Sequence, residues 1–291
     1  MQARHIIAFI FLAAIWGASF LFTRISSPEF GPLPFAILRI GIAAIALLPI
    51  LFIANHWQLL RQNIAVISVI SLLNSAIPFI LYGYTALYLN AGITSVLNAT
   101  TPILTAVLAH YYLKDQLTKK QLTGLIIGII GVTILVSDKI AWSSSNILPY
   151  IAPIGACLCY AVSANMTKKK LSYIPPKLIA ASSMFTASLM LIPFAIIYWP
   201  SQPPSLLAWY SIIAVALIST ALAYLIFFHL IKEVGPSKAV SVTLIIPIFG
   251  ILWGVLFLDE SITFEVVAGT LVILIGAYLS LSLNWLSGLR P

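Results

Sequence analysis

The residues best suited to chemistry in this chain are polar side chains that recur at helical spacing inside apolar segments. In one segment Asn74, Pro78 and Tyr82 recur every fourth residue, and a second segment carries Asn98 and Thr101. Residues three or four apart lie on one face of a helix. A carboxamide has four hydrogen-bonding positions and is costly in apolar surroundings unless it meets protein, water or a solute. These residues therefore predict reversible hydrogen bonding to a small polar solute.

Three further apolar segments carry candidates of the same kind. Trp16 and Tyr160 are placed near the middle of their segments, whereas the aromatic residues of membrane helices usually lie at the interface. The full set of candidate substrate-binding residues is Trp16, Ser19, Asn74, Pro78, Tyr82, Asn98, Thr101, Tyr160, Ser163, Thr220 and Tyr224. A Ser or Thr in a membrane helix often bonds the backbone of its own helix, so each hydroxyl is also compatible with a structural role.

The composition is that of an integral membrane protein. Of the 291 residues, 61% are apolar and 8% are charged, and the mean hydropathy is +1.08. Soluble domains carry about 25% charged residues. The apolar segments approach or exceed the ~20 residues with which a helix crosses ~30 Å of hydrocarbon, and they lack the short alternating pattern of a membrane barrel. We therefore expect an all-α integral membrane protein.

Apolar blocks separated by Pro, Gly, Asn and charged residues predict ten transmembrane helices. Their expected ranges are about 5–25, 33–54, 64–88, 92–113, 120–137, 147–167, 177–199, 206–231, 237–258 and 264–285. Helices of this kind must satisfy their backbone hydrogen bonds internally, because the hydrocarbon offers no water.

The distribution of basic residues predicts the orientation of these helices, because cytoplasmic loops carry an excess of Lys and Arg. With the N-terminus in the cytoplasm, the inner side holds Arg4, Arg61, Lys114, Lys119, Lys120, Lys168, Lys169, Lys170, Lys177, Lys232, Lys238 and Arg290. The outer side then holds only Arg24 and Lys139. We expect a multi-pass protein of the inner membrane with both termini cytoplasmic. The positive charge is explained by this topology and requires no nucleic-acid partner.

The chain also contains an internal repeat. Residues 102–131 and 247–276 share a pattern of apolar, acidic and glycine positions at an offset of 145. The matched pairs are Pro102 and Pro247, Leu113 and Leu258, Asp115 and Glu260, Leu117 and Ile262, Gly124 and Gly269, and Gly131 and Gly276. Because each copy has an odd number of spans, the second copy must be inverted relative to the first. We predict two inverted five-helix repeats, residues 1–143 and 144–291, around a central cavity.

Arg39 is the formal charge that hydropathy places inside a predicted span. It could bind an anionic group such as a carboxylate. The sequence favours a structural role, in which Arg39 snorkels to the outer interface or pairs with Glu29 or a helix-end carbonyl. At the matching place in the second copy stands Ser183, so the charge is not part of the shared scaffold.

The acidic residues indicate how transport could be energised. All of them are expected in loops or at helix ends: Glu29, Asp115, Asp138, Glu233, Asp259, Glu260 and Glu265. Proton-coupled exporters usually need an ionisable group within the pathway, so this placement disfavours coupling through a carboxylate. His110 and His229 are the remaining titratable candidates, near the cytoplasmic ends of their spans.

Other features bear on enzyme activity and assembly. We find no paired acidic metal motif, nucleophile elbow, zinc spacing or ATP-binding loop. Cys157 and Cys159 are the only cysteines, and on one helix they point in different directions. We therefore expect no catalytic residue, no metal, no cofactor and no enzyme activity. Glycine stripes in 120–137 and 264–285 predict packing surfaces, compatible with a monomer or a homodimer.

Four short motifs carry a resemblance to a known family. They are WGASF at 16–20, PEFGP at 28–32, LKDQLT at 113–118 and LDESIT at 258–263. Over its full length the chain resembles the drug/metabolite transporter superfamily, EamA type. The resemblance implies ten helices in two inverted repeats, with helices 1, 3, 4, 6, 8 and 9 around a central cavity and helices 5 and 10 at the periphery.

The resemblance also implies a function. Members export amino acids and other metabolites, so we expect a secondary transporter that exports small metabolites such as amino acids across the inner membrane by alternating access. A drug or toxic-compound efflux pump and a nucleotide or sugar-phosphate exchanger are alternatives within the superfamily. A membrane-embedded enzyme and a lipid flippase are alternatives from other classes. The expected partners are a small-molecule metabolite and the lipid bilayer.

Overall fold

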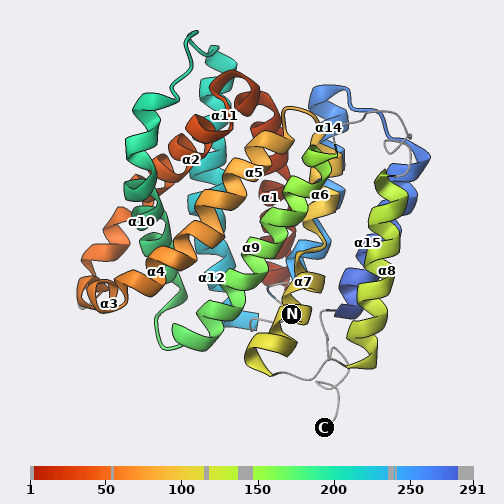
Figure 1. The fold of residues 1–291 in the computed structure, drawn as a ribbon, viewed down its shortest axis with the longest axis horizontal. Helices are drawn as coiled ribbons and strands as arrows, with labels where there is room; N and C mark the ends of the chain where they lie inside the picture. Colours follow the sequence, from red (N-terminus) through yellow and green to blue (C-terminus); the bar gives the residue numbers. More distant parts are fainter. Residues whose placement is uncertain are drawn as a thin grey trace.

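The computed structural model describes residues 3–53, 56–114, 118–136, 147–234, 239 and 241–280. Every regular element among these residues is a helix, and the helices form a bundle (Figure 1). In chain order they are α1 (Ala3–Phe30), α2 (Pro32–Leu47), η1 (Leu48–Phe52), α3 (His56–Gln62), α4 (Ile64–Ser71), η2 (Leu72–Ala76), α5 (Ile77–Thr85), α6 (Ala91–Asn98), α7 (Thr101–Leu113), α8 (Lys119–Val136), α9 (Leu148–Lys170), α10 (Pro176–Ile197), α11 (Leu206–Ala216), η4 (Leu217–Leu222), α12 (Ala223–Val234), η5 (Ser241–Leu244), α14 (Ile246–Leu258) and α15 (Phe264–Ser280).

Seven segments of the described chain are long and apolar enough to cross a membrane. They are Ala3–Phe30, Pro32–Phe52, Ile64–Thr85, Ala91–Leu113, Leu148–Lys170, Pro176–Phe194 and Leu206–Phe227. Val242–Leu258 and Phe264–Leu279 are shorter apolar helices. The predicted all-α membrane architecture is confirmed at this level, and the count of ten spans stays a prediction.

Several predicted spans change helix type along their length, and proline explains most of these changes. Pro49, Pro78, Pro102 and Pro247 each lie in the first turn of a new segment, in η1, α5, α7 and α14. A proline has no N–H to donate to the preceding turn, so the regular α-helical pattern stops there. The helix α3 lies between the second and third predicted spans, where the sequence predicts no helix.

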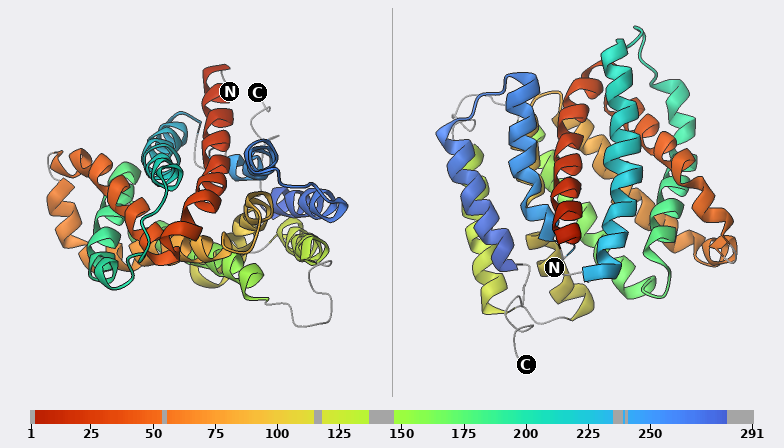
Figure 2. Two further views of the ribbon diagram at one scale, coloured as in Figure 1. Left: turned by 90° about the horizontal axis from the view of Figure 1, so that it is seen from above. Right: turned by 180° about the vertical axis from the view of Figure 1, so that it is seen from behind.

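The glycine stripes form a close contact between α8 and α15, which lie side by side (Figures 1 and 2). Gly276 lies against the backbone of Gly128, Gly131 lies against Ile273, and Gly269 lies against Leu135. Residue numbers therefore rise along α8 as they fall along α15. Because these two helices match in the sequence repeat, this pair of copies runs in opposite directions. The division into two whole inverted units stays a prediction.

Helices from the two halves of the sequence exchange partners. The first helix, α1, packs on α14, and α9 packs on α7. In the repeat α1 matches α9, and α7 matches α14, so the two contacts are equivalent to one another. Two further pairs, α2 with α10 and α8 with α15, join equivalent helices. Packing between the halves therefore holds the bundle together.

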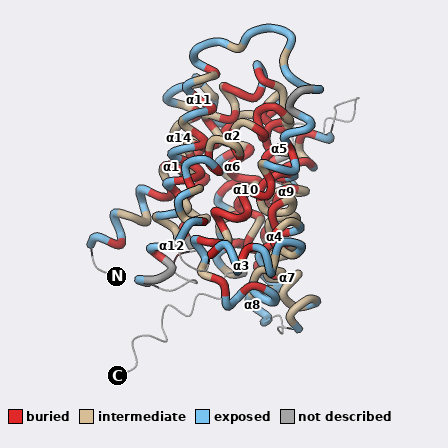
Figure 3. Tube along the Cα trace, turned by 90° about the vertical axis from the view of Figure 1, so that its left-hand side faces the viewer, coloured by how far each residue is buried: buried red, intermediate tan, exposed pale blue. Residues whose placement is uncertain are grey.

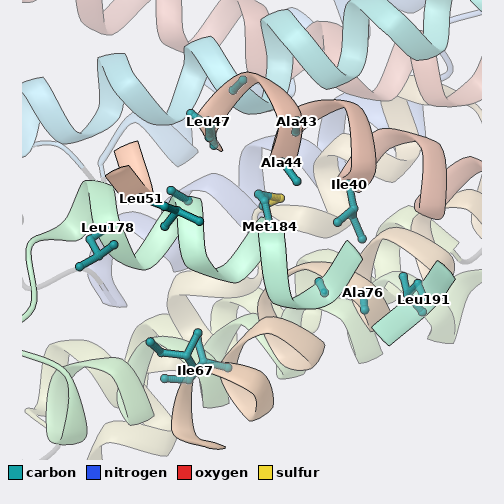
Figure 4. Close-up of a cluster of buried hydrophobic side chains, with 14 of the residues drawn as sticks. Ile40, Ala43, Ala44, Leu47, Leu51, Ile67, Ala76, Leu178, Met184 and Leu191 are labelled. Atoms are coloured by element: carbon teal, nitrogen blue, oxygen red, sulfur yellow. The ribbon is translucent and has the colours of Figure 1, made fainter. Parts of the chain in front are cut away.

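The largest apolar cluster lies between α2, α4 and α10 (Figure 4). Its members include Ile40, Leu47, Ile67, Leu178 and Met184, which are all buried. Buried residues gather in the middle of the bundle, whereas the loop between α10 and α11 is mostly exposed (Figure 3). One face of α2, including Ile40 next to Arg39, is buried in this cluster, whereas Ile45 is exposed.

Candidate functional site

The side chain of Arg39 lies inside the bundle. The residue is 6% exposed, Nε donates a hydrogen bond to Oγ1 of Thr220 at 3.1 Å, and the guanidinium carbon lies 3.8 Å from the ring centroid of Phe79. Glu29 instead accepts hydrogen bonds from the backbone N–H and the hydroxyl of Ser205. Two forms of the favoured structural role, snorkelling to the interface and pairing with Glu29, are therefore wrong; no bond from Arg39 to a helix-end carbonyl is found among the described residues, and a structural role as such stays a prediction. Arg39 is instead held by Thr220 of η4 and Phe79 of α5, in a helix that packs against α5, α10, α11 and η4.

Two tyrosines and an asparagine meet where α5, α6 and α9 approach one another. The hydroxyl of Tyr82 donates to Oδ1 of Asn98 at 2.7 Å and lies 3.5 Å from Sγ of Cys157. The rings of Tyr82 and Tyr160 stack, with centroids 6.2 Å apart. The ring of Phe20, from α1, meets Tyr82 edge-on at 5.7 Å. This arrangement presents phenol, carboxamide and aromatic surface in one place.

A second set of groups connects this place to α12. Nδ2 of Asn74 donates to the hydroxyl of Tyr224 at 3.3 Å. Arg39 bonds to Thr220, four residues before Tyr224, and lies on Phe79, three residues before Tyr82, while Tyr160 and Tyr224 pack against the same apolar cluster as α2. We name seven residues the Arg39 cluster: Arg39, Asn74, Tyr82, Asn98, Tyr160, Thr220 and Tyr224. Together they offer one cation, two carboxamides and three phenols, and the part of the chain that the structure describes contains no group of acidic, His or Cys residues that could hold a metal.

Two members of the Arg39 cluster lie in π-helical turns at matching places in the repeat. Asn74 belongs to η2 and Thr220 to η4, where the Thr220 hydroxyl donates to the carbonyl of Val215 at 2.8 Å. A π-helical turn inside an α-helix widens the turn and is frequent at functional sites. Pro78 follows the first of these turns by two residues, in α5, and so could have marked it in the sequence. No proline lies within or next to the second turn, and the sequence analysis predicts neither turn.

Comparison with known proteins decides the family. The pattern that defines the EamA-like transporter family matches residues 4–137 and again 147–282, which together cover most of the chain. The chain belongs to the EamA-like transporter family. It is therefore a multi-pass membrane transporter. The two matches also agree with the duplication found in the sequence.

Relatives of this EamA-like transporter carry names at different levels of detail. It is 24% identical to the uncharacterized transporter YoaV of Bacillus subtilis (strain 168), over 96% of this chain and 97% of that protein. It is 23% identical to a probable amino-acid metabolite efflux pump of Escherichia coli (strain K12), over 95% and 94%. A solved structure described as a crystal structure of protein shares the fold, with a TM-score of 0.68, 14% identity and 99% coverage of both chains.

The remaining predicted contact residues of this EamA-like transporter are placed differently from the Arg39 cluster. Trp16 packs against Phe227 at 5.1 Å, in an apolar cluster with Leu12 and Ala223. The hydroxyl of Thr101 donates to the carbonyl of Asn98 in the preceding turn. Ser19, Pro78 and Ser163 are buried. For all of these, contact with a solute stays a prediction, and Phe79 and Cys157 join the site without having been predicted.

The end of the bundle where α6 begins and α14 ends has a polar contact of its own. The carboxylate of Glu260 accepts hydrogen bonds from the backbone N–H groups of Ala91 at 2.7 Å and Gly92 at 3.1 Å. Arg24 donates to the carbonyl of Ala86 nearby. The bonds of Glu260 join the turn after α14, in the second half of the sequence, to the start of α6, in the first half. They connect the two halves of this EamA-like transporter on this side, whereas the Arg24 bond lies within the first half.

Proposed function

We propose that this EamA-like transporter is a secondary transporter that exports small metabolites such as amino acids by alternating access. The observation that carries the proposal is the Arg39 cluster. It brings buried and half-buried polar groups from α2, η2, α5 and α6 together with groups from α9, η4 and α12. The relatives from Escherichia coli and Salmonella typhimurium that are named probable amino-acid metabolite efflux pumps support the same solute class.

Alternating access follows from where the Arg39 cluster is built. A solute held between two halves of a bundle becomes accessible from either side when the halves rock about it. The hydrogen bonds from Arg39 to Thr220 and from Asn74 to Tyr224 both join the first half of the sequence to the second. Changes in these contacts would accompany such a motion.

The transport proposal is tested with the purified chain in proteoliposomes and a panel of labelled amino acids. We expect uptake of at least one of them, and we expect Asn74→Ala and Asn98→Ala each to slow it about 3- to 10-fold, the effect of losing one neutral hydrogen bond. Thr133→Ala is the matched control, since Thr133 is exposed on α8 and donates to its own helix. Wild-type rates in both asparagine variants would refute the proposed site.

We further propose that both termini lie in the cytoplasm. The loop after α10 is then outside and the turn after α9 inside, where Lys168, Lys169 and Lys170 precede it. Ser201 and Ser172 are exposed in these two connections. In a chain without its two native cysteines, Ser201→Cys should react with an impermeant maleimide on intact cells, and Ser172→Cys should react only after permeabilisation. The opposite pattern would contradict this orientation.

A further inference from the structure

Arg39 carries a positive charge that has no carboxylate partner among the described residues. The acidic residues that the structure describes lie at helix ends and in turns: Glu29, Glu233, Asp259, Glu260 and Glu265. The ion pairs in this part of the chain join Glu233 to Arg4 and His5. A buried charge is costly unless an opposite charge accompanies it. The guanidinium therefore favours an anion that comes from outside the described protein.

Two of the three guanidinium nitrogens of Arg39 are open to such a partner. Nε is bonded to Thr220, and neither Nη nitrogen has a hydrogen-bond partner in the described part of the chain. The described polar atoms that lack both a partner and contact with solvent are the hydroxyls of Ser75, Ser183 and Ser219. The Nη nitrogens are not among these sealed atoms, so they retain some accessible surface.

The geometry selects among anions. Two Nη groups with parallel N–H bonds match the two oxygens of a carboxylate in a bidentate pair. One guanidinium neutralises one negative charge, as on a carboxylate. A phosphate monoester carries a charge of about −1.5 to −2 at neutral pH. The Arg39 cluster has Arg39 as its one cation, so the second negative charge would not be balanced within it. The site therefore fits a monocarboxylate better than a phosphorylated solute.

The side chains around Arg39 indicate which groups would contact the rest of the solute. Phe79 supports one face of the guanidinium at 3.8 Å, and the stacked rings of Tyr82 and Tyr160 offer aromatic surface. The carboxamides of Asn74 and Asn98 each bond to one tyrosine and keep further bonding positions. An ammonium group can interact with carboxamide oxygens and aromatic faces without an acidic residue.

We infer that Arg39 binds the carboxylate of the transported solute through Nη1 and Nη2, while Thr220 and Phe79 hold the guanidinium in place. The substrate class is small monocarboxylates, amino acids included. This inference rests on the proposed transport function. Because the matching position in the repeat is Ser183, which has no charge, the carboxylate binds in one orientation, toward α2.

Three probes of similar shape test the inference on the full-length protein in detergent. L-leucine has a carboxylate and an ammonium group, 4-methylpentanoate has the carboxylate alone, and L-leucinamide has no carboxylate. Binding is measured by the rise in Tm with probe concentration, and transport by counterflow in proteoliposomes. Charge-assisted hydrogen bonds predict that the two carboxylates bind about 10- to 100-fold more tightly than L-leucinamide.

Variants of Arg39 assign the effect to this residue. Arg39→Gln should weaken carboxylate binding about 10- to 100-fold and leave L-leucinamide unchanged, and Arg39→Lys should lose part of the affinity because it is a point charge without the planar fork. Arg61→Gln, at an exposed residue of α3, is the control for loss of one positive charge. If Arg39→Gln does not fold, the binding of the three probes to Arg39→Lys and to wild type is compared instead.

The outcomes separate this inference from the transport proposal. Equal binding of L-leucine and L-leucinamide, no binding of any probe, or unchanged carboxylate binding in the Arg39 variants would overturn the inference and leave transport standing. Carboxylate binding that depends on Arg39, without counterflow of any solute, would support the inference and overturn the proposed function.

Discussion

Gly276→Ala should destabilise the protein by about 1–3 kcal/mol, the usual effect of forcing extra atoms into a packed contact. A Cβ at Gly276 would lie 2.6 Å from the backbone nitrogen of Gly128 and 2.7 Å from the carbonyl oxygen of Gly124. Both are backbone atoms, so no side chain can rotate away. The only relief is a separation of α8 from α15, which would open their whole contact. The free energy of unfolding or the Tm in detergent measures the effect.

The same substitution elsewhere provides the control. At Gly155 in α9 the nearest atom to an added Cβ is Cδ1 of Leu81, at 3.5 Å, which is an ordinary contact. Gly155→Ala should therefore leave stability unchanged or raise it by up to ~1 kcal/mol, because alanine favours a helix more than glycine does. Equal stability of the two variants would show that α8 and α15 do not meet backbone to backbone.

Glu260→Ala should cost about 2–3 kcal/mol of stability, because a hydrogen bond to a charged acceptor contributes about 1.5–3 kcal/mol and this carboxylate accepts two. The carboxylate is only half-buried, so water replaces part of the loss. The donors are the N–H groups of Ala91 and Gly92, which begin α6 and have no partner within their own helix. The negative charge also lies at the positive end of the α6 dipole. Hydrogen exchange by mass spectrometry should show faster exchange in a peptide covering residues 87–98.

Two variants sharpen this prediction. Glu260→Gln retains one acceptor oxygen and loses the charge, so its effect should lie between those of wild type and Glu260→Ala. Ser261→Ala, at the exposed neighbouring residue, should change stability by less than about 0.5 kcal/mol. Exchange at residues 87–98 that is the same in Glu260→Ala as in wild type would mean that this carboxylate does not hold the start of α6.

The polar helix faces show how far local sequence can locate a site. The spacing of Asn74, Pro78 and Tyr82 predicts a polar face, and the structure brings Asn74 and Tyr82 into the Arg39 cluster. The same kind of spacing suggested Thr101, whose hydroxyl donates to the carbonyl of Asn98 in the preceding turn. A periodic pattern reports the direction of a side chain around its own helix, but it does not report which partner the hydroxyl chooses.

Arg39 shows most clearly what local sequence cannot predict, which is the surroundings of a side chain in the folded bundle. Hydropathy places it two turns from the end of a span, where a flexible side chain usually reaches the interface. Its actual position depends on the helices around α2, which come from residues far away in the chain, including η4. The π-helical turn of η4 was equally hidden, because no proline marks it.

By itself the amino-acid sequence determined that this is an all-α membrane protein of duplicated design and a member of a transporter superfamily. The first two conclusions follow from composition, periodicity and a repeat within one chain, and the third is what the resemblance of four short motifs implies; all of these are local or linear properties. Only the tertiary structure decided that Arg39 lies inside the bundle on Thr220 and Phe79, and that α8 and α15, whose opposite directions the repeat predicts, meet backbone to backbone. The physical reason is that the cost of burying a charge or closely packing two glycines depends on neighbours that folding brings together from distant parts of the chain.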